Sequence, residues 1–526
     1  NVVSYEEAIA KAAEGLRARD GKVAAIVGDA SNEEGFLVQR LMREALGSAH
    51  IDSRPSRGPR ADVLRRLAEP NVSAKVRDID EADAILVLGT DPLHSSPILD
   101  LRVRKAIRRN GAKLVVATER PTALDGGAEA VFRYAPHGAT SFLMGLAGAL
   151  RGGDGEAPES DVADVLRDAE SVVVLWGERI GREDSATVKA LLDVAATLGL
   201  ADQDGSGLLE IPDFANARGL REAGCLPDAG PGLSETAAGM STEEIRAALI
   251  SGELTGLILL GADPLRDFPD TPAWEEALTA ADFVVSFSMH ENATTAKADV
   301  VLPLETHAEK DGTVTHPDGR LQRVRPSASR PGDIRPNIQV LAELAAKLGL
   351  DTGIDSQPTA FAALTEAVSF YNGITDEQIG GRGIRWQDTP SAANLPEPGR
   401  ASGPGSPGPP RSLPADPGPD APLTLGTYRD LWAGPITELN PPLRFLTPRQ
   451  RVEVSPADAE RLGLKTDETV RVSQDGSTVK AQVQIKERVP VGVVFMAEGV
   501  AGDNANALLN GGPVQVTIEK LSEVRA

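Results

Sequence analysis

Short apolar runs alternate with longer amphipathic stretches over the first 370 residues of the chain. In the amphipathic stretches, apolar residues recur at helical spacing, over 4–19, 33–46, 185–198, 338–348 and 359–370. The alternation of strands and helices predicts an α/β fold with parallel sheets. Six of the apolar runs have the length and composition of buried strands: Val23–Val27, Ala84–Leu88, Leu114–Ala117, Val172–Leu175, Leu257–Leu260 and Phe283–Phe287.

The pattern changes after residue 423, where apolar and polar residues alternate one by one. Asp475-Gly476 interrupts this alternation and is a strong hairpin signal. A short helix is predicted just before it, with Ser455 as N-cap, Pro456 at the first helical position and Gly463 after its end. We expect a small β-barrel that carries one short helix.

The chain contains an internal repeat, ILVLGTDPL at 85–93 and LILLGADPL at 257–265. In both copies a predicted strand ends in Gly-Xaa-Asp-Pro, with Gly89 and Asp91 in the first and Gly261 and Asp263 in the second. Gly permits close backbone approach, Asp accepts hydrogen bonds from free N–H groups, and Pro ends the strand. Two related α/β halves with such loops at the carboxyl ends of their strands favour a ligand crevice. Ordinary strand exits are the alternative interpretation.

The length of 526 residues predicts three to four domains. From Pro390 to Pro422, 11 of 33 residues are proline, mixed with Gly, Ser and Asp, which predicts an extended or disordered tether. We expect one α/β domain from 1–60 and 240–385, a second from 61–239, a linker over 386–422, and the barrel over 423–526.

The composition limits the classes of partner that the chain is expected to bind. Lys and Arg total 54 and Asp and Glu total 77, so the formal charge is 54 − 77 = −23, which argues against a nucleic acid or anionic lipid partner. No apolar run reaches the roughly 18–20 residues of a membrane span, so no direct membrane insertion is expected. One local exception to the negative charge is a basic strip formed by Arg320, Arg323, Arg325, Arg330 and Arg335. Its arginines are either solvated or salt-bridged, or they form an anion site or a subunit contact.

The single cysteine, Cys225, excludes disulfides within the chain and an iron–sulfur cluster ligated by this segment alone, because such clusters need about four Cys. A buried, inert Cys225 is favoured over a reactive thiol. The six histidines show no metal-ligand spacing and are expected to be surface or hydrogen-bonded side chains. The chain begins with Asn1 and lacks signal-peptide features, so we expect a fragment of a longer protein.

Four segments together carry a family resemblance: SYEEAIAKAAEGL near the start, ILVLGTDPL, the run ADVVLPLETHAEKDGTVTHPDGRLQRVR at 298–325, and SPADAERLGL at 455–464. With them the chain resembles the molybdopterin oxidoreductases, which include formate dehydrogenases and nitrate reductases. Within that family it is most similar to the large iron–sulfur subunit of bacterial NADH:quinone oxidoreductase, respiratory complex I. The resemblance covers nearly all of the chain except the linker.

The resemblance implies two pseudo-repeated Rossmann-like parallel-sheet domains that sandwich a molybdopterin guanine dinucleotide cofactor, and a C-terminal double-psi β-barrel that closes over it. It also implies an iron–sulfur segment ahead of Asn1. The positions that match cofactor-contacting loops are Gly89, Asp91, Gly261, Asp263, Glu309, Gly312 and Thr313.

The resemblance also provides a test of activity. In active members a Cys, selenocysteine, Ser or Asp ligates the metal from the loop after the helix matching 33–46. Here that loop is IDSRPSRGPR at 51–60, and Arg57 or Gly58 falls at the ligand position; neither binds molybdenum. A shifted alignment would bring the Ser53 or Ser56 hydroxyl there instead.

The resulting hypothesis is a scaffold part of the large subunit of NADH:quinone oxidoreductase, with a vestigial pterin site, no catalytic residue and no metal or cofactor of its own. It implies peripheral-arm subunits of complex I as partners, on the cytoplasmic side of the plasma membrane. The first alternative is a catalytic, formate dehydrogenase-like subunit that holds molybdopterin guanine dinucleotide. The second is a nucleotide-binding module that uses the Gly-Xaa-Asp-Pro crevice for another ligand.

Overall fold

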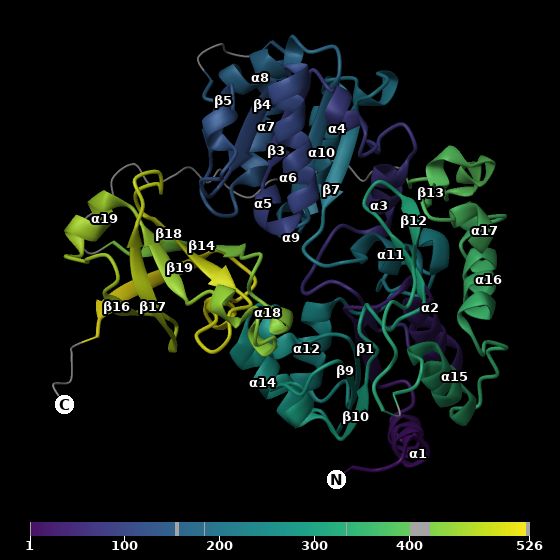
Figure 1. The fold of residues 1–526 in the computed structure, drawn as a ribbon. Helices are drawn as coiled ribbons and strands as arrows, with labels where there is room; N and C mark the ends of the chain where they lie inside the picture. The colour runs from purple at the N-terminus through teal and green to yellow at the C-terminus, as the bar shows by residue number, and fades with distance from the viewer. Residues whose placement is uncertain (1, 153–156, 184, 333, 400–420, 522–526) are drawn as a thin grey trace. The chain divides into compact units, whose positions relative to one another are not determined.

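The computed structural model describes residues 2–152, 157–183, 185–332, 334–399 and 421–521 (Figure 1). The chain divides into two compact units. Unit 1 comprises 1–70, 214–268 and 273–400, and unit 2 comprises 71–213, 269–272 and 401–526. No helix in the described ranges has the length and apolarity needed to cross a bilayer.

Unit 1 is built on a five-stranded parallel sheet in the order β10-β9-β8-β1-β2. A small antiparallel sheet, β11-β12-β13, lies beside it in the same unit. The strands are β1 (Val23–Val27), β2 (Ile51–Asp52), β8 (Gly256–Leu260), β9 (Phe283–Ser288), β10 (Val300–Pro303), β11 (Gly312–Thr315), β12 (Arg320–Val324) and β13 (Ile384–Arg385).

Helices cover both faces of this sheet, because its central strands bury every side chain. Ala25 and Ile258 face a core shared with α1, α2 and α15, whereas Ile26 and Leu259 face α12 and α14. The helices of unit 1 are α1 (Tyr5–Arg17), α2 (Asn32–Arg40, continued by a π-helical turn, Leu41–Ala45), α3 (Ala61–Ala68), α11 (Ala217–Glu222), α12 (Thr242–Ser251), α13 (Pro264–Asp267), α14 (Thr271–Ala280), α15 (Asn337–Lys347), α16 (Gln357–Ala367) and α17 (Asp376–Ile379).

The boundaries of unit 1 differ from those expected from the sequence. Residues 61–70 and 214–239, assigned there to the second α/β domain, pack in unit 1, where the Cys225 thiol donates a hydrogen bond to the Gly35 carbonyl at 3.3 Å. The fold also continues past residue 386, because Trp386 is fully buried and short 3₁₀ turns follow it up to Asn394. The remainder of the predicted linker, 400–420, lies outside the described residues.

Unit 2 combines a second five-stranded parallel sheet, β5-β4-β3-β6-β7, with a closed six-stranded barrel, β14-β18-β15-β17-β16-β19. The sheet strands are β3 (Ala84–Leu88), β4 (Lys113–Thr118), β5 (Ala130–Arg133), β6 (Val172–Gly177) and β7 (Gly207–Ile211); the barrel strands are β14 (Leu423–Arg429), β15 (Arg451–Val454), β16 (Thr469–Gln474), β17 (Ser477–Ile485), β18 (Val493–Glu498) and β19 (Val514–Lys520).

The helices of unit 2 include the predicted barrel helix, whose N-cap Ser455 accepts a hydrogen bond from the Asp458 N–H at 3.1 Å. The predicted hairpin at Asp475-Gly476 joins β16 to β17, with positive φ at both residues. The helices are α4 (Asp78–Glu81), α5 (Pro92–Ser95), α6 (Pro97–Lys105, continued by a π-helical turn, Ala106–Asn110), α7 (Ala139–Leu150), α8 (Ser160–Arg167), α9 (Ile180–Glu183), α10 (Ser185–Thr197), α18 (Pro435–Leu439) and α19 (Pro456–Arg461).

The two parallel sheets have the same spatial plan, which explains the repeat in the sequence. The repeated segments form β8 and β3, which occupy the central position of their sheets, and the next strands along the chain, β9 and β4, pair on the same side. In both copies the Pro of Gly-Xaa-Asp-Pro opens a one-turn helix, α13 or α5, directly after the strand. The α/β class, the two related sheets and the C-terminal barrel are therefore confirmed.

A tight backbone contact fixes the repeated loops in both sheets. A Cβ on Gly28, after β1, would lie 2.3 Å from the Gly261 carbonyl oxygen, and a Cβ on Gly177, at the end of β6, would lie 2.6 Å from the Gly89 carbonyl oxygen. Gly89 and Gly261 also have left-handed φ values of 62° and 60°. The obstacle is backbone in each case, so only glycine allows the neighbouring strands to end this close together.

We predict that Gly177→Ala destabilises unit 2 by about 1–3 kcal/mol, because a methyl group there forces apart two hydrogen-bonded strands. Urea unfolding followed by circular dichroism measures the shift. Gly148→Ala is the matched control, since Gly148 lies in α7 with open space around it and should gain slightly in helix stability. Equal unfolding midpoints for Gly177→Ala and the native chain would contradict the close-contact argument.

Candidate functional site

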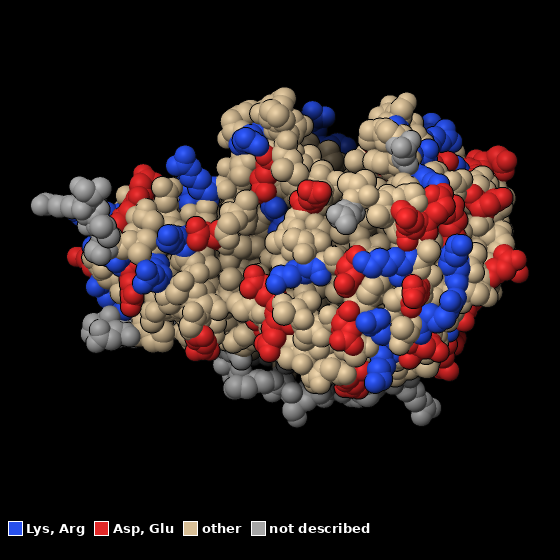
Figure 2. Space-filling view, turned by 90° about the horizontal axis from the view of Figure 1, so that it is seen from below, with Lys and Arg blue, Asp and Glu red and all other residues tan. Residues whose placement is uncertain are grey.

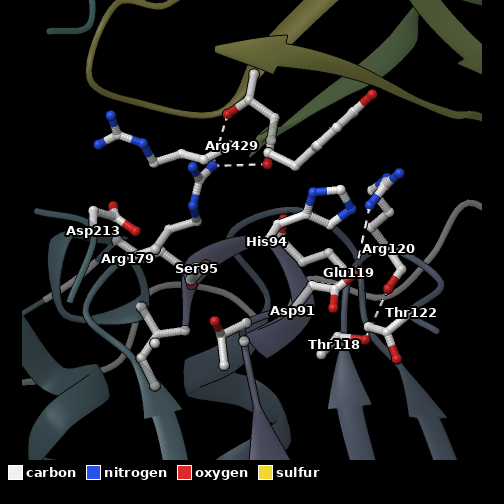
Figure 3. A pocket seen from close by; sticks show the side chains of 17 residues that line it. Asp91, His94, Ser95, Thr118, Glu119, Arg120, Thr122, Arg179, Asp213 and Arg429 are labelled. Carbon is white, nitrogen blue, oxygen red and sulfur yellow. Dashed lines mark hydrogen bonds and ion pairs between the residues drawn. The ribbon is translucent and has the colours of Figure 1, made fainter. Parts of the chain in front are cut away.

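A polar pocket lies in unit 2 at the carboxyl ends of β3, β4 and β6 (Figure 3). The chain leaves β3 toward β4 on one side of the sheet and returns to β6 on the other, so the pocket sits where the strand order reverses, the usual ligand position in open parallel sheets. On the barrel side, the pocket is lined by residues of β14. The lining residues are Gly89, Thr90, Asp91, His94, Ser95, Thr118, Glu119, Arg120, Thr122, Gly177, Arg179, Ile180, Glu183, Asp213, Thr427, Tyr428 and Arg429.

Arg120 follows β4 and reaches the barrel. Its Nε and Nη2 each lie 2.8 Å from one carboxylate oxygen of Glu453, which forms a two-pronged ion pair. The guanidinium carbon lies 3.7 Å from the centre of the Tyr428 ring, a cation–π contact. Burial raises the pKa of Glu453, but Arg120 and Lys486 outweigh this and hold the pKa below its ordinary value. Groups of the barrel therefore bind the Arg120 guanidinium in two ways, by hydrogen bonds along its edge and by a ring contact on its planar face.

Arg179 follows β6 and makes the second link to the barrel. Its Nη2 lies 2.9 Å from Glu498 Oε1, and its Nη1 donates to both oxygens of Thr427 at 2.8 Å. Asp213 is held nearby by Arg182 at 2.7 Å. Burial raises the pKa of Asp213, but Arg182, Arg179 and Arg429 outweigh it and leave the carboxyl ionised. The cations of the pocket thus lie close to carboxylates of the same unit.

Glu119 and Glu183 form a carboxyl pair at the inner end of the pocket. The two carboxyls interact with each other, and burial raises the pKa of both, that of Glu183 well above its ordinary value. Glu119 accepts from the His137 N–H at 3.0 Å, and Glu183 accepts from the Ala139 N–H at 3.4 Å. Two buried carboxyls this close together disfavour simultaneous ionisation, which raises the pKa of the pair.

The first Gly-Xaa-Asp-Pro loop lies in this pocket. Asp91 caps α5 by accepting the Leu93 N–H at 3.2 Å, and its carboxylate lies 3.9 Å from Arg120. Burial raises the pKa of Asp91, while His94 and Arg120 oppose that effect. Gly89 approaches Ile180 so closely that its Cβ would lie 2.2 Å from Ile180 Cγ2. The structure thus places both residues predicted for this half at the edge of the pocket.

The second loop lies in unit 1, at the carboxyl ends of β8 and β1. The Gly261 carbonyl accepts the Asp29 N–H at 2.8 Å, and the Asp263 carboxylate accepts a hydrogen bond from Thr294. Asp29 in turn pairs with His307 at 3.0 Å, which raises the pKa of His307. Asp29 therefore connects the Gly261 loop to His307, which lies in the run at 298–325.

The other residues predicted from that run are tied to neighbouring backbone and to α2. Glu309 accepts the Thr306 N–H at 3.0 Å and stabilises its own turn. Thr313 donates its N–H and its hydroxyl to the buried Glu33 carboxyl at 2.8 and 2.9 Å. A Cβ on Gly312 would lie 2.9 Å from Ser31 Cβ, so glycine allows β11 to approach the start of α2. These contacts give Glu309, Gly312 and Thr313 internal roles in unit 1.

The loop at 51–60, which is expected from the family resemblance to match a metal-ligand loop, is organised around a buried ion pair. Arg54 points inward and binds Asp52 through Nε at 2.8 Å and Nη2 at 3.0 Å, while its Nη1 donates to the Pro59 carbonyl at 2.9 Å. Arg57 points to Glu243 at 3.3 Å. A Cβ on Gly58 would meet the Arg54 side chain at 2.8 Å. Within the described ranges, no group of three or more His, Cys, Asp or Glu side chains is placed to hold a metal ion.

The remaining sequence candidates are satisfied internally. Cys225 is fully buried, which confirms the prediction of a buried cysteine, and burial raises its pKa to about 12. Figure 2 shows basic and acidic side chains interspersed on the face drawn. Four of the five arginines of the basic strip are ion-paired, which supports the salt-bridged interpretation: Arg320 with Asp318 at 3.8 Å, Arg323 with Asp311 at 3.0 Å, Arg335 with Glu343 at 3.2 Å, and Arg330 with Glu305.

Sequence reasoning missed most residues of the pocket. Arg120 and Arg179 each follow the end of a predicted strand, so their positions alone would have identified them as crevice residues. Their partners Glu453 and Glu498 lie more than 300 residues further along the chain and carry no motif. Only the three-dimensional structure brings these four residues together.

Comparison with known proteins places the chain in a family. The molybdopterin oxidoreductase model matches residues 2–347, and the molybdopterin dinucleotide binding domain model matches 423–519. The chain belongs to the molybdopterin oxidoreductase family. Acetylene hydratase from Pelobacter acetylenicus has the same fold, with a TM-score of 0.72 at 14% identity over 99% of this chain and 90% of that one.

Three similar sequences are named as subunits of oxidoreductases. The alpha subunit of an NADPH-Fe(3+) oxidoreductase from Geobacter sulfurreducens is 29% identical over 93% of this chain and 63% of its own length. The G subunit of NADH-quinone oxidoreductase from Mycobacterium tuberculosis is 28% identical over 99% of this chain and 61% of its own length. The alpha subunit of F420-dependent formate dehydrogenase 2 from Methanococcus maripaludis is 26% identical over 93% and 83%. The chain thus spans less than two thirds of the first two relatives.

We predict a pH-dependent stability from Glu33, whose pKa is raised to about 7 by burial, against opposing hydrogen bonds from Thr313 and Gln357. The unfolded carboxyl titrates near 4.5, so the folded chain binds this proton more tightly. The stabilisation is complete below about pH 4.5 and is lost as the pH rises through about 7, a contribution of about 3 kcal/mol.

Urea unfolding at a series of pH values measures this contribution. Glu33→Gln should flatten the decline in stability between about pH 5 and pH 8. Glu14→Gln, an exposed position on α1, is the control and should leave the profile unchanged. A Glu33→Gln profile parallel to that of the native chain would show that Glu33 is ionised throughout.

Proposed function

We propose that this chain is the scaffold part of the large iron–sulfur subunit of an NADH:quinone oxidoreductase, with a molybdopterin site that no longer operates. On this proposal it supports the transfer of electrons from NADH to quinone, which iron–sulfur clusters carry out in a segment outside this sequence. Its partners are the other subunits of the peripheral arm of that complex, on the cytoplasmic side of the membrane. The segment itself performs no catalysis.

The observation that carries the proposal is the loop at 51–60. A molybdenum ligand from this loop would be a thiolate, selenolate, hydroxyl or carboxylate directed at the metal. Arg57 and Gly58 offer none, and the carboxylate of Asp52 is fully buried and bound by Arg54. The two residues at the expected ligand position and the ion-paired Asp52 therefore do not fit a metal ligand, and we derive no reaction step through molybdenum.

The relatives support the same interpretation. The G subunits of NADH-quinone oxidoreductase from Mycobacterium tuberculosis and Rhizobium meliloti match 99% and 98% of this chain, so the correspondence runs through both units. Family members whose names state different activities share the fold. The choice among these activities therefore depends on the loop at 51–60 and not on the architecture.

A catalytic, formate dehydrogenase-like subunit is the second candidate. It is favoured by the Methanococcus maripaludis formate dehydrogenase subunit, of which this chain covers 83%. In that case Ser53 or Ser56 would have to supply the ligand. Ser56 is buried, and its hydroxyl lies 3.5 Å from the Arg57 carbonyl.

Metal and pterin analysis of the full subunit, purified within its native complex, separates the two candidates. We expect iron and sulfide but no stoichiometric molybdenum or tungsten, and no pterin in acid-oxidised extracts. An active formate dehydrogenase processed in parallel is the positive control. Stoichiometric molybdenum together with extractable pterin would refute the scaffold proposal and support the catalytic one.

The buried pair in the same loop gives a structural prediction. Asp52→Asn removes the carboxylate that binds the buried Arg54 guanidinium, which should destabilise unit 1 by about 3–5 kcal/mol. The control is Asp62→Asn, because the Arg60–Asp62 pair at 3.9 Å is solvent-exposed and should contribute at most about 1 kcal/mol. Thermal unfolding monitored by calorimetry compares them, and similar small losses in both variants would show that Arg54 does not depend on Asp52.

A further inference from the structure

The pocket of unit 2 has the cations that an anionic ligand would need, in the place where such a ligand would be expected. Arg120 and Arg179 follow β4 and β6, at the carboxyl edge of sheet strands that flank the point where the strand order reverses. Arginine is well suited to such a role because its planar guanidinium binds phosphate or carboxylate through two parallel hydrogen bonds. Arg429, a third arginine of the lining, interacts electrostatically with Asp213, so the groups that Arg120 and Arg179 bind decide whether these two side chains can take an anion.

Both arginines are bound by carboxylates of the barrel. Arg120 uses the two donors of one edge on Glu453, at 2.8 Å each, and Arg179 lies 2.9 Å from Glu498. These contacts are sheltered from solvent, since the side chains of Glu453 and Glu498 are only 2% and 13% exposed. Charge-assisted pairs of this geometry are strong, and solvent screens them little.

The neighbouring groups also disfavour a second anion. Lys486 completes the pairing of Glu453 at 2.5 Å, and the Asp91 carboxylate lies 3.9 Å from Arg120 on the pocket side. The Glu119–Glu183 pair adds further acidic groups to the wall. A phosphate that displaced Glu453 or Glu498 would leave a buried carboxylate without its partner, which is strongly unfavourable.

We propose that Glu453 and Glu498 act as built-in anions that occupy the anion positions of the unit 2 pocket. They exclude phosphate-bearing ligands and fasten the barrel to the parallel sheet of unit 2. The inference deepens the proposed function, on which it rests for its biological meaning, because it extends the loss of the cofactor from the metal loop to the dinucleotide pocket. Its physical support comes from contacts within unit 2 alone.

The test is the binding of inorganic pyrophosphate to the full chain at low ionic strength, followed by the unfolding temperature and by titration calorimetry. The native chain and the control Glu487→Gln, an exposed barrel position, should show no dose-dependent shift. The double variant Glu453→Gln/Glu498→Gln frees both arginines and should be stabilised by pyrophosphate through mass action. Adding Arg120→Gln and Arg179→Gln to that variant should abolish the shift.

Two results would overturn the inference: pyrophosphate binding by the native chain as tight as that by the double variant, or no binding by a folded double variant. If the double variant does not fold, a charge exchange provides the second test. Arg120→Glu should lower the unfolding temperature, and Arg120→Glu/Glu453→Arg should restore a large part of the loss. Failure of the exchanged pair to recover any stability would also overturn the inference.

This test is separate from that of the proposed function. A native complex that lacks molybdenum while its pocket binds pyrophosphate would refute the built-in anions and leave the scaffold proposal intact. The opposite result is a complex that contains molybdenum and whose chain binds pyrophosphate only after Glu453 and Glu498 are changed. That result would refute the scaffold proposal and leave the built-in anions intact.

Discussion

The structure depends on a close backbone contact that occurs once in each parallel sheet. Gly28 meets Gly261 in one sheet and Gly177 meets Gly89 in the other, at distances that exclude any side chain. This contact brings the ends of two central strands together and fixes where the Gly-Xaa-Asp-Pro loops leave the sheet. Pro92 and Pro264 then turn the chain into short helices. The two halves keep this arrangement although their surrounding side chains have diverged.

Charged side chains are buried near the strand ends in both units. The groups that pair with them determine which ligands each unit can bind. In unit 2, barrel carboxylates neutralise Arg120 and Arg179, so groups suited to bind a ligand instead stabilise the unit. In unit 1, Arg54 is neutralised by Asp52 within the loop at 51–60. In both places a buried cation is matched by a carboxylate of the chain itself. A buried cation without such a carboxylate would be strongly destabilising.

The sequence predicts those parts of this structure that depend on local patterns. The central strands follow from continuous apolar runs, the capped barrel helix from Ser455, and the repeat from its nine-residue copies. The two-residue strand β2 carries no periodic signal. Likewise, nothing in the sequence indicates that Arg54 turns inward or that Glu453 meets Arg120, because such pairs form only when distant segments pack. For the same reason the predicted linker begins too early, at Trp386, whose burial depends on distant parts of unit 1.

An experimental structure of the native complex, at a resolution that places side chains, tests the central claim most directly. We expect Glu453 to bind Arg120, Glu498 to bind Arg179, and Arg54 to fill the loop at 51–60. Continuous density for a dinucleotide between those arginines and the barrel, with the two glutamates displaced, would contradict the claim.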